Sequence, residues 1–77
     1  MNTLQKLKII VEKESARLLK ETETSSTWEE LDLDSLSMIS ILRDVEDEFN
    51  IVLEYNIFKD HKITCINDFS EYIDKKL

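Results

Sequence analysis

Residues 30–39 read Glu-Leu-Asp-Leu-Asp-Ser-Leu-Ser-Met-Ile, and this stretch decides how the chain is organised. An acidic loop changes here into a helical pattern, and Ser35 lies at the junction. Asp34 suits the N-cap because its carboxylate can accept a backbone N–H of the first helical turn, where negative charge also favours the helix dipole. We therefore predict a helix that begins at Ser35 and leaves the Ser35 hydroxyl exposed. Ser35 can contribute to the helix start, serve as a nucleophile or be an attachment point.

The predicted helix runs from about residue 35 to residue 48, because its apolar side chains recur at helical spacing. Leu36 and Ile39 lie to one side of this apolar stripe, closer to Ser35. The stripe is expected to face the core, and Asn50 is a possible C-cap. The side chains predicted to be buried are Met38, Ile41, Leu42, Val45 and Phe49.

Two further long helices and one short helix are expected. The first spans about residues 3–20 and is capped by Asn2 or Thr3. Its apolar stripe, which is expected to face the core, is formed by Leu4, Leu7, Val11 and Leu18, with Ile10 and Leu19 flanking it. A short helix is expected at 55–60. The last helix is expected from Cys65 or Ile66 to Lys76, with Thr64 as a candidate cap.

A polar connection at residues 21–34 joins the first two long helices. Residues 27–30 match a capping box, and the apolar anchors Trp28, Leu31 and Leu33 are expected to hold the connection against the helices. These elements predict an all-α protein, a small bundle of three main helices plus a short one. We expect one domain over residues 1–77.

Charge is concentrated in the middle of the chain. Of the net charge of −7, residues 21–54 contribute −10, because they hold eleven acidic residues and only Arg43 as a base. Such a surface disfavours nucleic acid, which needs Lys and Arg to neutralise its phosphates. It favours partners with basic patches, although a solvated acidic face that aids solubility remains an alternative.

Residue types for catalysis and for metal binding are scarce. His61 is the only histidine and Cys65 the only cysteine, so neither a disulfide nor a usual zinc site is expected. No oxyanion-hole signature accompanies Ser35, and no catalytic residue is predicted. We expect His61 in a solvated loop and Cys65 in the core. Without a signal peptide or an apolar run of about 20 residues, a cytoplasmic protein with no membrane span is expected.

The motif around Ser35 resembles that of the acyl carrier protein family. The matching residues are Leu33-Asp34-Ser35-Leu36, then Met38 to Leu42, then Val45-Glu46-Asp47-Glu48-Phe49. The segment from Ile63 to Ile73 is similar to the last helix of the family. The resemblance covers essentially the whole chain.

The resemblance implies a carrier that catalyses nothing itself. A phosphopantetheinyl transferase would attach 4'-phosphopantetheine to Ser35 through a phosphodiester. The thiol of the arm would hold an acyl group as a thioester and present it to acyl-loading and acyl-processing enzymes. A monomer is expected.

The resemblance also implies which residues meet partners. Asp34 would engage the transferase, Glu46 and Asp47 would dock to basic patches, and Leu36 and Ile39 would lie beside the arm. Arg43 replaces an apolar or small contact position of the family. The predicted partner-docking residues are Asp34, Leu36, Ile39, Arg43, Glu46 and Asp47.

Several positions depart from the family pattern. Ser37 and Ser40 stand where acidic residues are frequent, and Asp32 stands where glycine is frequent. These departures favour a specialised biosynthetic carrier, for example in polyketide or other secondary-metabolite synthesis, with a fatty-acid carrier as the other pathway. Two alternatives remain: an aminoacyl or peptidyl carrier, and an acidic helical adaptor without a prosthetic group.

Overall fold

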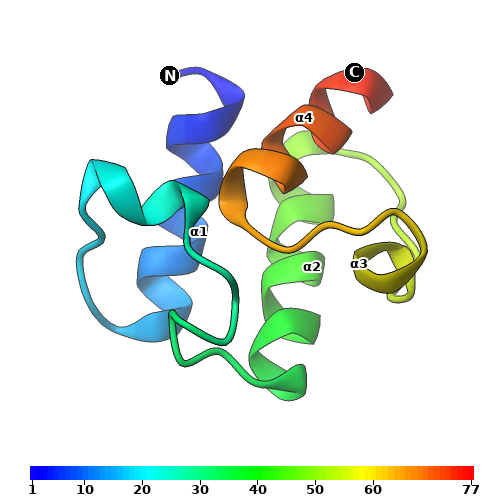
Figure 1. Cartoon of the computed structure of the whole chain (residues 1–77). Coiled ribbons are helices and arrows are strands. Elements are labelled where there is room, and N and C mark those ends of the chain that lie inside the picture. The colour runs from blue at the N-terminus through cyan, green and yellow to red at the C-terminus, as the bar shows by residue number, and fades with distance from the viewer.

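Three main helices and one short helix make up the fold of a computed structural model that describes residues 1–77 (Figure 1). They are α1 (Thr3–Ser15), α2 (Ser35–Phe49), α3 (Ile57–Asp60) and α4 (Ile66–Lys76), and a 3-10 helix, η1 (Glu21–Ser25), follows α1. Helix α1 packs against both α2 and α4. The predicted all-α bundle of three main helices plus a short one is confirmed. No helix is long and apolar enough to cross a membrane.

One cluster of 17 buried apolar side chains holds these helices together. Each main helix contributes side chains without solvent exposure, such as Leu7 from α1, Ile41 from α2 and Phe69 from α4. The α2 stripe is buried as predicted at Met38, Ile41, Leu42 and Val45. Phe49, predicted to be buried with them, is only half-buried at the end of α2, where the Lys6 ammonium lies 5.7 Å from its ring centroid.

The prediction that the first helix reaches residue 20 was wrong, because α1 ends at Ser15. Ala16 adopts a left-handed conformation (φ 60°) and its N–H donates to the Glu12 carbonyl. The chain then turns, so that Leu18 is 84% exposed and Leu19 enters the core. The predicted burial of Leu18 was therefore also wrong. No glycine marks this stop, and the apolar spacing alone gave no sign of it.

The same structural device ends both α1 and α2. Each helix is followed by a residue in the left-handed conformation, Ala16 after α1 and Asn50 after α2. The N–H of this residue donates to the carbonyl of the glutamate four positions earlier, Glu12 or Glu46. The glutamate side chain then accepts the backbone N–H seven residues ahead, which pairs Glu12 with Leu19 at 2.7 Å and Glu46 with Leu53 at 2.8 Å. Both leucines are buried. Each glutamate therefore fixes the chain as it leaves its helix.

The connection before α2 is fixed at residues 27–30. The predicted capping box is present, since the Thr27 N–H donates to Glu30 Oε1 at 2.7 Å and the Glu30 N–H donates to Thr27 Oγ1 at 3.2 Å. It closes a turn rather than a helix. The indole N–H of Trp28 donates to the Ile63 carbonyl at 3.0 Å, and an isolated bridge joins Thr27 to Cys65. These contacts tie the connection to the segment before α4.

The start of α4 differs in one detail from the prediction. Its N-cap is Cys65, not Thr64. The hydroxyl of Thr64 instead donates to the Asp68 carboxylate at 3.1 Å. Cys65 is buried as predicted, and burial raises the pKa of its thiol. The short helix begins at Ile57, two residues later than expected, because Tyr55 and Asn56 form a turn.

Candidate functional site

Ser35 is the first residue of α2 and is exposed. The cap is supplied by Asp34, whose carboxylate accepts the Ser37 N–H at 2.9 Å. That N–H stabilises the ionised form and lowers the pKa of Asp34 below its usual value. The predicted cap is confirmed. The Ser35 hydroxyl makes no hydrogen bond within the chain, so it is not used for capping and is free to react.

A cavity of about 500 Å³ opens beside Ser35. Its wall comes from the loop before α2, from α2 itself and from residues 55–58. Seven of its nine lining side chains are hydrophobic. They are Trp28, Leu33, Met38, Ile39, Leu42, Tyr55 and Phe58. An apolar chain attached at Ser35 would therefore find an apolar enclosure next to its attachment point.

Three aromatic rings form one wall of this cavity and the core behind it. The ring centroid of Phe58 lies 5.8 Å from that of Trp28 and 5.1 Å from that of Phe69, and the rings meet edge to face. Such pairs prefer this geometry because the positive ring edge meets the negative ring face. Trp28 is held in addition by its hydrogen bond to Ile63. This wall of the cavity is thus fixed by contacts between segments distant in sequence.

A second hollow of about 580 Å³ continues along α2. It shares Ile39, Leu42 and Tyr55 with the first cavity, and Tyr55 is 78% exposed between them. The second hollow is more polar, since Arg43 and Glu54 line it. Together the two hollows make a trough that starts at Ser35 and runs between α2 and residues 53–56. Sequence reasoning missed the part played by Tyr55, which only its place in the fold reveals.

The predicted docking residues of α2 share one face. At about 100° per residue, Leu36, Ile39, Arg43, Glu46 and Asp47 lie within about 100° of the helix circumference. Leu36 is 75% exposed and Ile39 42% exposed, and Arg43 and Asp47 are also exposed. Glu46 is half-buried, because its carboxylate holds Leu53. This set of five residues is called the docking face below.

His61 and Cys65 lie elsewhere. His61 is exposed and its ring lies 4.9 Å from that of Tyr72, while Cys65 is buried. No hydrogen bond joins either residue to Ser35. The structure therefore brings no base to the serine, and nothing in its geometry activates Ser35 as a nucleophile.

Comparison with known proteins gives the family. A family model described as the phosphopantetheine attachment site matches residues 5–73. The chain belongs to the acyl carrier protein family. Its curated relatives include the acyl carrier protein of Streptococcus thermophilus, 28% identical over 76 residues, which are 99% of this chain and 97% of that protein. The acyl carrier protein of Cylindrotheca is 38% identical over 80 residues, which cover 99% of this chain and 94% of that protein.

Family membership defines the general role of the chain. Acyl carrier proteins are carriers and not catalysts, and their prosthetic group is 4'-phosphopantetheine. An exposed, unbonded serine hydroxyl beside an apolar cavity fits this group, because the hydroxyl can be esterified and the cavity can shelter an acyl chain. No solved structure gives a significant match.

Proposed function

We propose that this carrier protein bears its phosphopantetheine arm on the Oγ atom of Ser35 and presents an acyl group to enzymes that dock on α2. The observation that carries the proposal is the position of Ser35, an exposed serine with a free hydroxyl at the edge of the apolar cavity. We also propose that residues 1–77 form a single domain and that the protein is a monomer. The single hydrophobic cluster supports the first of them.

The residues around Ser35 suit an anionic arm and an apolar cargo. When bound, the arm supplies a thiol that holds the acyl group as a thioester. The N-terminal amides of α2 favour a phosphodiester at Ser35, since the positive end of a helix dipole stabilises an anion. Asp34 keeps the first turn of α2 closed through Ser37. The apolar walls near Trp28 and Phe58 exclude water from the acyl chain.

The docking face suits short-lived complexes. Its acidic residues steer partners that carry basic patches, and only Leu36 and Ile39 offer apolar contact. Such interfaces form fast and dissociate fast, which a carrier needs when it visits several enzymes in turn. The first partner is a phosphopantetheinyl transferase, which Asp34 helps to engage, and the later partners load and process the acyl group.

The pathway we propose is a specialised biosynthetic one with its own loading ligase or ketosynthase. Arg43 on the docking face, together with Ser37 and Ser40 elsewhere on α2, supports this choice because these side chains change the charge that a partner meets. Fatty-acid synthesis is the alternative pathway. Loading assays with ligases and transferases of each class distinguish fatty, other acyl and aminoacyl cargo.

Mass spectrometry tests attachment directly. The protein is incubated with a broad-specificity phosphopantetheinyl transferase and coenzyme A, and we expect one added arm on the wild type and none on Ser35→Ala. Ser37→Ala is the matched control, since Ser37 lies two residues away in the same turn, and it should be modified normally. An unmodified wild type, or equal modification of Ser35→Ala, would contradict the proposal. If the protein were instead an acidic adaptor, Ser35→Ala would bind its partner as well as the wild type does.

A further inference from the structure

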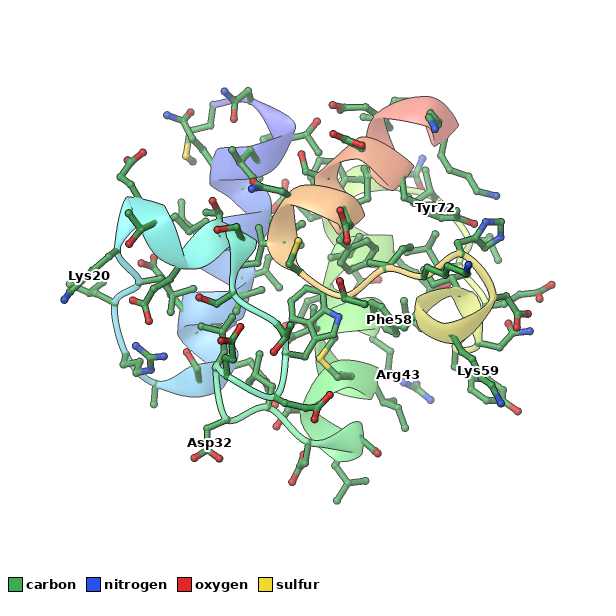
Figure 2. The ribbon with its side chains drawn as sticks, in the orientation of Figure 1. Lys20, Asp32, Arg43, Phe58, Lys59 and Tyr72 are labelled. Carbon is green, nitrogen blue, oxygen red and sulfur yellow. The ribbon has the colours of Figure 1, made fainter.

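Arg43 is the one basic residue in a long acidic stretch of the sequence, and Lys59 of α3 lies on the same side of the molecule (Figure 2). Between residues 21 and 58 the chain has eleven acidic residues and no other lysine or arginine. Arg43 is exposed and projects from α2 on the side where α3 lies (Figure 2). A positive charge at this place changes what the acidic residues of α2 can bind.

Arg43 has no partner within the chain. Asp44, Glu46 and Asp47 are near it in sequence, yet the ion pairs of the structure are Lys6 with Glu48 and Arg17 with Glu23. Arg43 also makes no side-chain hydrogen bond to another residue of the chain. The Glu46 carboxylate is already engaged with the Leu53 N–H. The five N–H donors of the guanidinium are therefore available to a partner.

Arg43 also lies near the middle of the docking face. It is one helical turn after Ile39 and one turn before Asp47, so an enzyme that covers both must cover Arg43 as well. A guanidinium that loses its water there needs an acceptor, because a desolvated charge without a partner is strongly unfavourable. A carboxylate is the best match, since it accepts two parallel hydrogen bonds from one guanidinium.

We propose that Arg43 is a specificity-determining residue of the docking face. It admits enzymes that present a carboxylate opposite it within an otherwise basic patch, and it disfavours enzymes whose docking patch is basic throughout. Like charges brought together at an interface oppose binding. Arg43 therefore favours enzymes with an opposing carboxylate and also disfavours enzymes with a wholly basic patch. The proposal rests on the proposed function, because it requires enzymes to dock on α2.

The experiment uses the arm-loaded, acylated protein and a ketosynthase of bacterial fatty-acid synthesis whose docking patch is wholly basic. Loading at Ser35 is confirmed first by mass spectrometry, so a failure of the carrier function is recognised before Arg43 is tested. The KM of the ketosynthase is then measured for wild type, Arg43→Gln and Arg43→Met. The control is Lys20→Met, since Lys20 is an exposed cation on the opposite side of the molecule (Figure 2).

We expect both Arg43 variants to lower KM roughly tenfold with little change in kcat, because they remove a repulsion from the encounter. Lys20→Met should leave KM within about twofold of wild type, because a surface charge outside the contact has little influence. The gain from Arg43→Gln should shrink in high salt, where the Debye length falls to about 3 Å at 1 M. Unchanged KM in both variants would overturn the proposal. A gain for Arg43→Met without a gain for Arg43→Gln would also overturn it, since that result indicates apolar contact.

Acidic substitutions in the ketosynthase test the attractive half of the proposal. Each basic residue of its docking patch is changed singly to glutamate, and KM is measured against wild-type carrier and against Arg43→Glu. We expect at least one glutamate variant of the enzyme to have a lower KM for the wild-type carrier than for Arg43→Glu. The unmodified enzyme should have the lower KM for Arg43→Glu. If no glutamate variant improves the wild-type carrier, Arg43 does not select a carboxylate.

Discussion

The Glu46 carboxylate accepts a hydrogen bond from the backbone N–H of Leu53 at 2.8 Å, and this bond holds the chain against α2 after the helix ends. Glu46 therefore has a structural task in addition to the docking role that we propose for it. Asp47, its neighbour on the docking face, is exposed and makes no hydrogen bond through its side chain. The two acidic residues should differ when they are substituted.

Glu46→Ala should lower the free energy of unfolding by about 1–2 kcal/mol, because it removes a hydrogen bond to a charged acceptor. Asp47→Ala should stay within about 0.5 kcal/mol of wild type, as is usual for exposed positions. Urea denaturation followed by circular dichroism measures both values. Equal losses in the two variants would show that the bond to Leu53 contributes nothing. Charge reversal at Asp47 is consequently the cleaner test of docking, since it leaves the fold intact.

Asp34 should make stability depend on pH. Its pKa is lowered in the folded protein by the Ser37 N–H, so folding favours the ionised carboxylate. The ionised Asp34 therefore stabilises the fold at pH values above its usual pKa of 3.8. This stabilisation is lost as the pH falls through the lower pKa of the folded protein. At neutral pH we expect the Tm of the wild type to exceed that of Asp34→Asn. In acid we expect this difference in Tm to vanish. A difference in Tm that does not change with pH would contradict this assignment.

Ala16→Gly should stabilise the protein. Ala16 is held at φ 60°, where its Cβ is crowded and glycine is not. We expect a gain of about 0.5–1 kcal/mol in the free energy of unfolding, measured in urea. Ser26→Gly is the matched control, because Ser26 has an ordinary extended conformation (φ −72°) and glycine there should destabilise. A loss of stability for Ala16→Gly would show that α1 does not end in a left-handed residue.

Phe69 should matter more than Phe49 for stability. Phe69 has no solvent exposure and packs edge to face against Phe58, whereas Phe49 is half-buried. Phe69→Ala should cost about 3–5 kcal/mol, and Phe49→Ala should cost clearly less. Phe69→Leu keeps most of the volume and provides a folded variant if the alanine variant does not fold. Equal losses for Phe49→Ala and Phe69→Ala, or a greater loss for Phe49→Leu than for Phe69→Leu, would contradict this ranking.

Trp28 should report the cargo by its fluorescence. It is the only tryptophan and lines the cavity beside Ser35. An acyl chain that enters this cavity replaces water near the indole, so we expect a change in emission when an eight-carbon acyl group is loaded but little change when an acetyl group is loaded. Ser35→Ala has no site for the arm, so the same treatment should leave its emission unchanged. Identical spectra for the two acylated forms would show that the chain does not enter the cavity.

Local sequence determined the start of α2 and its buried stripe. Asp34 forms its cap with a residue three positions ahead, and Met38 to Val45 follow helical spacing, so both features depend only on near neighbours. The exposed position of Ser35 follows from that cap. The match of this segment to a family pattern indicates the carrier role from the sequence alone.

Tertiary structure alone decided where α1 ends, which residues form the cavity and which charge stands unpaired. At the early stop of α1 the Glu12 carboxylate accepts the Leu19 N–H, a contact that helical spacing cannot predict. The cavity needs Trp28, Leu42 and Phe58 together, which only packing of three segments achieves. Arg43 has acidic neighbours in sequence, yet the folded arrangement leaves it free of them, because ion pairing depends on the directions of side chains as well as on their order in the chain.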